Sequence, residues 1–361
     1  MTGRDRLRAV LRKEPHDGFA WTTLVDDTSL RHFPEELRGH GGVDFYRHID
    51  CDIFMLNGWN LPHGFRSPEL QWGPGVETTW KQEGDHSRSE LRAPYGALTS
   101  IHGKGGHPLK YKVDSLESLR LFRRMWEGAR YVEHDDRPVL EAIDGVIGND
   151  GVVTRFWGPS TVPQLLEMDA GTENFYYLLH DHPDEMDSLI RTIHEKELAA
   201  FRILARTPCD SVTLCENTST YYISPDVYRR YNMPHQREFV DVVKGAGKAA
   251  ILHMCGHVRD LLADIRETGC DGIHALTPSP TGNTPWEEAL DVIGEDLIIF
   301  GCLDPSVFIS GPLDRIGPTL DRIVIPRLAA SNFVLCPFAD GVAVPLERFQ
   351  AVSNWCWRRK V

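Results

Sequence analysis

Short apolar runs recur along this chain, and each is followed by a turn and then by a segment with helical periodicity. Runs of this kind are typical of buried strands, and helices that separate successive strands join parallel neighbours. The strands that we expect occupy residues 19–22, 51–56, 152–157, 211–215, 250–253, 272–276, 297–300 and 332–336. Eight strands that alternate with helices predict an α/β fold, most simply a (β/α)8 TIM barrel.

The end residues of the connecting helices support this alternation. The segment SPDVYRRYNMPHQREFVDVVKGAG starts at a Ser224 cap and places Pro225 at the first helical position, and Gly245 or Gly247 ends it. The segment TPWEEALDVIG repeats the same arrangement of a hydroxyl cap, a proline and a final glycine. Both segments are therefore predicted to be helices on the outside of the barrel.

Two regions depart from the strand–helix alternation. The opening MTGRDRLRAVLRKEP predicts an N-terminal helical extension that ends before Pro15. Residues 60–110 have an alternating, glycine-punctuated pattern, which predicts an antiparallel hairpin around residues 70–100, inserted after an early strand. Neither region has the length or composition of a separate domain, so we expect residues 1–361 to form one barrel domain.

The charge and hydropathy of the chain exclude several classes of partner. A formal net charge of −13 disfavours nucleic acid and anionic membrane surfaces, which both attract basic patches. The sequence contains no apolar run long enough for a transmembrane helix, and the charged opening residues lack the apolar core of a signal peptide. We therefore expect a cytoplasmic protein whose eight cysteines are free, buried or bound to metal.

Polar residues with catalytic chemistry follow several of the predicted strands. In a barrel, the residues where strands end and loops begin form the active site. Glu216 and Asn217 follow one strand, His253 and Cys255 end another, and Cys336 ends the last. Residues i and i+2 of an extended segment share a face, and imidazole and thiolate are ligands that zinc prefers. The pattern predicts a zinc site on His253, Cys255 and Cys336, with Glu216 as fourth ligand or nearby base.

Longer segments around these residues resemble one protein family. The stretch SPDVYRRYNMPHQREFVDVVKGAGKAAILHMCGHVRDLLADIRETGCDGIHAL, the stretch GEDLIIFGCLDPSVFISGPLDRI and the opening MTGRDRLRAVLRKEPHDG are similar to the uroporphyrinogen decarboxylase-like superfamily. The similarity is strong from about residue 205 to 350 and weak from about 20 to 130. It implies a (β/α)8 barrel.

Within that superfamily, the chain resembles the branch of corrinoid-dependent methyltransferases. Residues 20–40 lack the arginine-rich motif with which uroporphyrinogen decarboxylases grip propionates. The methyltransferases bind zinc through H-x-C and a distant cysteine, and this chain has His253-x-Cys255 with Cys336 further on. The last motif departs from the coenzyme M type: in LCPFADG, Cys336 stands about three residues early, and Ala339 falls near the usual cysteine position.

The resemblance also implies a cofactor and a partner. No D-x-H-x-x-G corrinoid-binding motif occurs in the chain, so the corrinoid (cobalamin) is expected on a separate small protein that docks at the barrel mouth. A homodimer is common for such barrels. We expect the methyl group to move from a small donor, such as an aromatic methyl ether, to the cobalt. Glu216 and Asn217 are the candidate catalytic groups, because a carboxyl group can protonate a leaving phenoxide.

Flat side chains near the strand ends suit an aromatic substrate. Those near the expected barrel mouth are Trp59, Trp157, Tyr221, Tyr222 and Phe338. Ordinary barrel packing is the alternative explanation for each of them.

Three other activities remain open from the sequence. Methyl transfer from the corrinoid to a thiol would reverse the direction. A decarboxylase of another small acid would use charged groups such as Arg155 and Asp144. A barrel that binds zinc without catalysis is the third.

Overall fold

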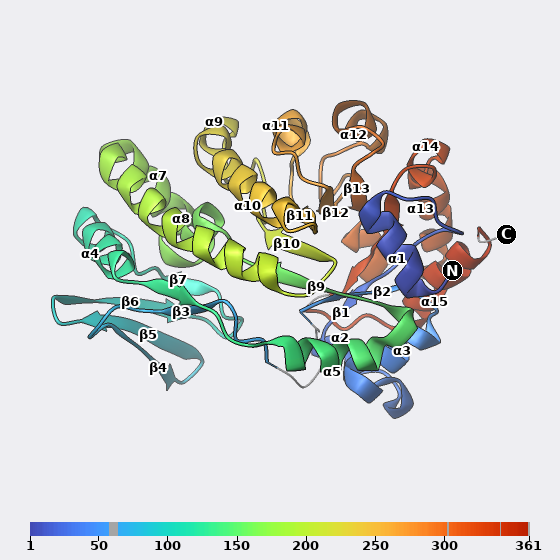
Figure 1. The fold of residues 1–361 in the computed structure, drawn as a ribbon, viewed down its shortest axis with the longest axis horizontal. Coiled ribbons are helices and arrows are strands. Elements are labelled where there is room, and N and C mark those ends of the chain that lie inside the picture. Colours follow the sequence, from blue (N-terminus) through green and yellow to red (C-terminus); the bar gives the residue numbers. More distant parts are fainter. Residues whose placement is uncertain (58–63, 302, 340, 360–361) are drawn as a thin grey trace.

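A curved sheet of parallel strands forms the centre of the molecule. The computed structural model describes residues 1–57, 64–301, 303–339 and 341–359 (Figure 1). The strands lie in the spatial order β14-β13-β12-β11-β10-β9-β2. They are β2 (Ile53–Leu56), β9 (Gly151–Trp157), β10 (Ser211–Cys215), β11 (Ala249–His253), β12 (Gly272–Leu276), β13 (Ile298–Gly301) and β14 (Phe333–Leu335).

The eighth side of the barrel is an irregular segment between β14 and β2. Leu335 N donates to Ala20 O at 3.1 Å, and Asp52 N donates to Trp21 O at 2.9 Å, so this segment contacts both edges of the sheet. Further along, β1 (Leu24–Val25) pairs in parallel with β15 (Phe338–Ala339). Pro337 has no N–H to donate, and it interrupts the ladder between β14 and β15. The predicted barrel is confirmed, but residues 19–22 form a single bridge at Trp21 and not a strand.

Helices cover much of the outer face of the sheet (Figure 1), but the first of them packs Leu7, Val10 and Leu11 into the core inside the barrel. They are α1 (Gly3–Arg12), α2 (Asp27–Leu30), α3 (Val43–His48), α4 (Leu116–Glu127), α5 (Arg137–Ile147), α6 (Thr161–Gln164), α7 (Gly171–Asp181), α8 (Pro183–Arg206), α9 (Pro225–Val227), α10 (Met233–Gly245), α11 (Leu262–Glu267), α12 (Trp286–Ile293), α13 (Ile316–Ile323), α14 (Pro326–Ala329) and α15 (Leu346–Trp357). No helix in the described part of the chain is both long and apolar enough to span a membrane.

The helix expected from residue 224 is interrupted. Ser224 caps α9 as predicted, because its Oγ accepts the Val227 N–H at 3.3 Å. A π-helical turn at Tyr228–Asn232 then precedes α10, which ends at Gly245. Pro234 lacks the N–H that a regular helix would use at this point, which explains the break in the hydrogen-bond pattern.

Side-chain alternation along the strands separates two apolar cores. Inward residues such as Phe54, Ile251 and Phe300 pack with Cys336 inside the barrel. Residues on the other face of each strand, such as Leu252 and Ile299, pack against the surrounding helices in a larger cluster. Because successive residues of a strand point to opposite faces, the apolar runs are buried on both sides.

The insertion is a small antiparallel sheet at one end of the molecule (Figure 1). Its strands are β4 (Glu77–Glu83), β5 (His86–Ala93), β6 (Gly96–His102) and β7 (Pro108–Lys110), and β6 contacts α4. A separate pair, β3 (Glu69–Gln71) and β8 (Arg130–Val132), lies nearby in the sequence. The predicted hairpin is therefore present as part of a larger sheet.

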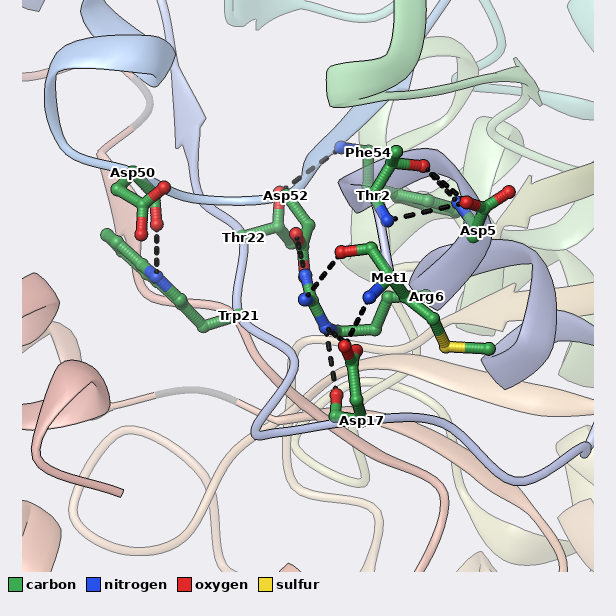
Figure 2. Close-up of polar contacts among 10 residues, drawn as sticks. All are labelled: Met1, Thr2, Asp5, Arg6, Asp17, Trp21, Thr22, Asp50, Asp52 and Phe54. Atoms are coloured by element: carbon green, nitrogen blue, oxygen red, sulfur yellow. Dashed lines mark hydrogen bonds and ion pairs between the residues drawn. The ribbon is translucent and has the colours of Figure 1, made fainter. Parts of the chain in front are cut away.

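The N-terminal helix is tied to the barrel by a buried arginine (Figure 2). Arg6 donates from Nη1 to Asp52 Oδ1 at 2.5 Å and from Nε to the Asp17 carbonyl at 2.9 Å. Phe54 N donates to Thr22 Oγ1 at 3.3 Å in the same region. These contacts join α1, the irregular segment and the start of β2 into one unit.

Candidate functional site

A cavity of about 370 Å³ opens where the parallel strands end. Almost every side of the barrel contributes to its wall. The lining residues are Leu24, Leu56, Phe156, Cys215, Asn217, His253, Cys255, His274, Ala275, Thr277, Thr281, Pro305 and Phe338. None of these described residues is Lys, Arg, Asp or Glu. The wall is thus mostly apolar, with two imidazoles, two thiols, two threonine hydroxyls and one amide.

Strand register brings the imidazoles and thiols together. Along β11, Ala249 and Ile251 point into the barrel core, so His253 faces the same interior two residues later. The pairing places Cys215 of β10 opposite His253, and His253 opposite His274 of β12. Cys255 follows His253 by two residues and also reaches the wall. Three neighbouring strands, together with the residues that follow β11, therefore supply the donor atoms.

His253 and His274 form a hydrogen-bonded pair. Their Nδ1 atoms are 2.7 Å apart, so one ring donates and the other accepts. Desolvation lowers the pKa of His253 to about 4, and desolvation together with the neighbouring His253 lowers the pKa of His274 well below its ordinary value. Both rings are consequently neutral at neutral pH, and the ring that donates from Nδ1 keeps a lone pair on Nε2 that a metal could use. Phe338 lies edge-on to His274, with ring centres 5.1 Å apart.

The two thiols meet at Asn217. Cys215 Sγ and Cys255 Sγ donate to Asn217 Oδ1 at 3.3 and 3.6 Å. Desolvation raises the pKa of both thiols, so each stays protonated unless a cation stabilises the thiolate. Asn217 has φ = 42°, a left-handed conformation that asparagine tolerates, and it donates from Nδ2 to Glu167 Oε2 at 3.3 Å. The predicted catalytic residue Asn217 therefore lies on the cavity wall.

Glu216 faces away from the cavity. It is fully buried behind β10, where Gln236 Nε2 and Asn232 Nδ2 donate to its Oε2 at 2.6 and 3.3 Å. Alternation along the chain is the reason, because Cys215 and Asn217 occupy the inward positions on either side. The structure does not bring Glu216 to the predicted metal ligands or to a substrate in this cavity.

Cys336 is also separated from the cavity wall. Only 1% of its surface is exposed, and it packs with Phe300 and Val334 inside the barrel. Its inward direction agrees with the prediction, but the next inward residue, Phe338, is the one that lines the cavity. Burial raises the pKa of the Cys336 thiol, as expected of a packed core cysteine.

The aromatic candidates divide between the cavity and the outer surface. Phe338 lines the cavity, whereas Trp157 points outward and packs edge-on against Tyr131. Tyr221 is 79% exposed, and Tyr222 is half-buried outside the lining. Trp59 lies outside the described residues, as do Cys302 and Asp340. Phe156 is a lining aromatic that we did not single out from the sequence.

The charged groups considered for a decarboxylase have structural partners. Arg155 is buried on the outer face of β9, where its Nε donates to Asn57 Oδ1 at 3.0 Å and its guanidinium stacks over Phe65. Asp144 forms an ion pair with Arg4 at 2.8 Å. Neither residue lines the cavity, so the structure gives no support to an acid-binding site built on them.

A larger cavity of about 470 Å³ lies elsewhere, beside β8 and the end of α8. Its charged residues pair with one another, as in the Arg206–Glu133 and Arg137–Asp135 ion pairs. It shares no lining residue with the strand-end cavity, which holds the candidate metal ligands His253 and Cys255.

Two potential metal ligands of the cavity were not chosen as site residues from the sequence, His274 and Cys215. Cys215 ends β10, so the rule that selected His253 could have found it, whereas His274 lies in the middle of β12. The signal was weak because each is a single residue inside an apolar run, without an H-x-C partner. Together with His253 and Cys255 they give a set of nitrogen and sulfur donors whose chemistry fits zinc.

Comparisons with known proteins identify the class to which this barrel belongs. The family described as Uroporphyrinogen decarboxylase (URO-D) matches residues 146–346, which is more than half of the chain. The chain belongs to this family, as its sequence motifs predicted.

Two curated relatives show a more specific similarity than the family match does. The methylcobamide:CoM methyltransferases MtbA of Methanosarcina mazei and Methanosarcina acetivorans are each 26% identical, over 159 and 172 residues. These alignments cover 43% and 46% of this chain, and 43% and 48% of the relatives, so the chain matches less than half of their length. The relatives are of the corrinoid methyltransferase branch that the motifs indicated.

A solved structure shares the fold over nearly the whole chain. It is a methyltransferase from Methanosarcina mazei, with a TM-score of 0.62, 15% identity and 99% of both chains covered. At that identity the likeness shows the barrel fold alone.

Proposed function

We propose that this protein is a corrinoid-dependent methyltransferase that moves a methyl group between a small molecule in the strand-end cavity and the cobalt of a separate corrinoid protein. The observation that carries the proposal is the H-x-C pair, His253 and Cys255, on the wall of that cavity. The curated relatives, named methylcobamide:CoM methyltransferases, support the same chemistry.

We further propose that His253 and Cys255 hold a zinc ion, with Cys215 as a further donor at the wall and His274 as the partner that orients His253. Bound zinc would act as a Lewis acid on the heteroatom that carries or receives the methyl group. The protein contributes neutral imidazoles through desolvation and a hydrogen bond that orients His253. Asn217 positions the two protonated thiols before metal binds, since both donate to its Oδ1.

The neutrality of the wall supports a neutral methyl donor, such as an aromatic methyl ether. None of the described lining residues carries a carboxylate, a guanidinium or an ammonium group, so these side chains offer no ion-pair partner to a charged substrate. Phe156 and Phe338 offer flat apolar surface to an aromatic ring. Transfer to a thiol is the second candidate, and the relatives' names favour it.

Assays that measure methyl transfer in both directions, to cobalt and from cobalt, test the proposal. The enzyme is mixed with cob(I)alamin and a methoxylated aromatic, or with methylcobalamin and 2-mercaptoethanesulfonate, and the cobalt spectrum is followed. We expect methylation of cobalt in the first mixture, and loss of this activity in Cys255→Ala. Cys209→Ala is the matched control, because Cys209 lies outside the cavity and its Sγ donates to the Ser211 carbonyl.

Each outcome either assigns the direction of methyl transfer or contradicts the proposed function. Turnover in the second mixture alone would reverse the direction and keep methyl transfer. Absence of turnover in both mixtures, with a corrinoid protein also supplied, would contradict the proposed function.

A further inference from the structure

Two helices on the outside of the barrel carry the same short motif. Helix α8 contains His194-x-x-Glu197, and α10 contains His235-x-x-Glu238. Residues three apart lie on the same face of a helix, so each motif presents one imidazole and one carboxylate together. Helices α8 and α10 pack against each other, which brings the two motifs face to face (Figure 1).

The motifs pair across the helix interface. His194 Nε2 lies 2.7 Å from Glu238 Oε2, and His235 Nε2 lies 2.8 Å from Glu197 Oε2. The centres of the two imidazole rings are only 3.3 Å apart. Each carboxylate thus binds the histidine of the other helix, and the four side chains form one compact cluster.

One imidazole nitrogen in this cluster lacks a hydrogen-bond partner. Glu197 accepts from His235 and also from the Thr161 N–H at 3.0 Å, so it acts as an acceptor, and His235 Nε2 must be the donor. The other ring nitrogen of His235, Nδ1, then carries a lone pair. It is buried without a partner in a residue that is 2% exposed. A carboxylate behind the ring and a free lone pair in front of it is the arrangement of a metal-binding histidine.

We propose that His194, His235 and Glu238 form a second metal site, which takes zinc. Their ligand atoms lie within 4.8 Å of one another, and no other three such side chains among the residues that the structure describes come this close. Because zinc bonds to nitrogen and oxygen are about 2.0–2.2 Å long, the three side chains would move slightly closer to one another around the ion. Two imidazoles favour zinc over magnesium or calcium, which prefer oxygen ligands.

The position of this site suggests a structural role. Glu238 is 50% exposed, so the ion can reach the cluster from solvent and keep a water as fourth ligand. The ion would join α8 to α10, whose neighbouring residue Gln236 holds Glu216 directly beside Asn217 of the cavity. The proposal does not depend on the cavity metal or on methyl transfer, since none of its ligands lines the cavity.

Metal titration of the full chain tests the site separately from the cavity. The Cys255→Ala protein, freed of metal by a chelator, is titrated with Zn²⁺ by calorimetry and with Co²⁺ by absorption. We expect one equivalent to bind and to raise the thermal unfolding midpoint. The Co²⁺ spectrum should show visible bands without a sulfur-to-cobalt charge-transfer band, because the ligands are nitrogen and oxygen.

Ligand variants in the same background decide the assignment. His194→Ala and the milder Glu238→Gln should each weaken Zn²⁺ binding at least about tenfold and abolish the thermal shift, with circular dichroism unchanged. Glu195→Gln is the matched control, an exposed neighbour on α8 outside the cluster. Unchanged affinity in both folded ligand variants, or no bound ion in the Cys255→Ala protein, would overturn the site.

Discussion

At the scale of single residues, the cavity depends on a histidine pair more than on the H-x-C motif alone. His274 Nδ1 lies 2.7 Å from His253 Nδ1 and fixes the direction of that ring. A partner that orients a metal ligand typically matters for both affinity and activity. His253 therefore has a defined orientation before any metal or substrate binds.

Replacement of His274 tests this orientation. In His274→Phe, a ring still packs against Phe300 and Phe338, but the contact to His253 is lost. We expect zinc affinity at the cavity and the methyl-transfer rate to fall about 10–100-fold, as for other orienting partners. Chelator competition and the cobalt assay measure the two effects. His102→Phe, a buried histidine in the inserted sheet, is the control, and equal behaviour of the two variants would contradict the orienting role.

Glu216 gives a prediction about stability and pH. Burial raises its pKa above the ordinary 4.5, so ionisation is more costly in the folded state than in the unfolded one. The resulting stability is fully present below about pH 4.5 and is lost as the pH rises through the folded-state pKa. Both amide donors reach Oε2, so the glutamine carbonyl of Glu216→Gln can replace it.

We expect Glu216→Gln to be more stable than the wild type by about 1–3 kcal/mol at neutral pH, which is the usual cost of a poorly satisfied buried polar group. The difference should shrink as the pH falls below about 4.5, where the carboxyl is protonated in both states. Urea unfolding at several pH values measures it. Methyl transfer should persist in this variant. A Glu216→Gln protein that folds but no longer transfers methyl groups would show instead that Glu216 takes part in catalysis.

At the scale of elements, the sequence predicted those features that local chemistry determines. The apolar runs at 211–215 and 272–276 became strands with those bounds, and Ser224 capped a helix as expected. Residues 19–22 do not form the predicted strand. Their pairing partner, the segment that contains Leu335, is interrupted at Pro337, and this segment lies more than 300 residues away in the sequence. The site followed the same rule: strand ends located His253 and Asn217.

Which neighbours complete the site could not be predicted from the sequence. The contact between His253 and His274 depends on the register between β11 and β12. The outward direction of Glu216 depends on where β10 ends and on the amides that α10 supplies. Both are set by tertiary pairing, which a strand-by-strand analysis does not contain.

The attachment of α1 to the barrel gives an element-scale prediction. Arg6 and Asp52 form a buried ion pair, whereas Arg8 on the same helix pairs with Asp210 near the surface. Removing one partner of a buried pair costs about 3–5 kcal/mol, and a surface pair contributes about 0–1 kcal/mol. We expect Arg6→Ala to lower the free energy of unfolding by about 3 kcal/mol and Arg8→Ala by less than about 1. Equal losses in urea titrations would contradict this role.

At the scale of the whole molecule, the two ends of the chain share one core. Phe349 of α15 is fully buried, with ring centres 5.9 Å from Phe33 and 5.0 Å from Phe45. Ser353 Oγ donates to the Ile49 carbonyl at 2.6 Å. The segment around α3, between β1 and β2, therefore packs on the last helix, which supports residues 1–361 as one cooperative domain.

Buried cysteines allow that cooperativity to be tested along the chain. Cys51 and Cys356 lie near the two ends, and Cys215 and Cys270 lie in the middle, all buried. If the barrel unfolds as one unit, pulsed thiol labelling read by mass spectrometry should expose all four at the same urea concentration. Phe349→Ala should lower that midpoint for all four together, through a loss of about 3–5 kcal/mol from the shared core. Early labelling of Cys51 and Cys356, with Cys215 and Cys270 still protected, would show instead that the chain ends form a separate unit.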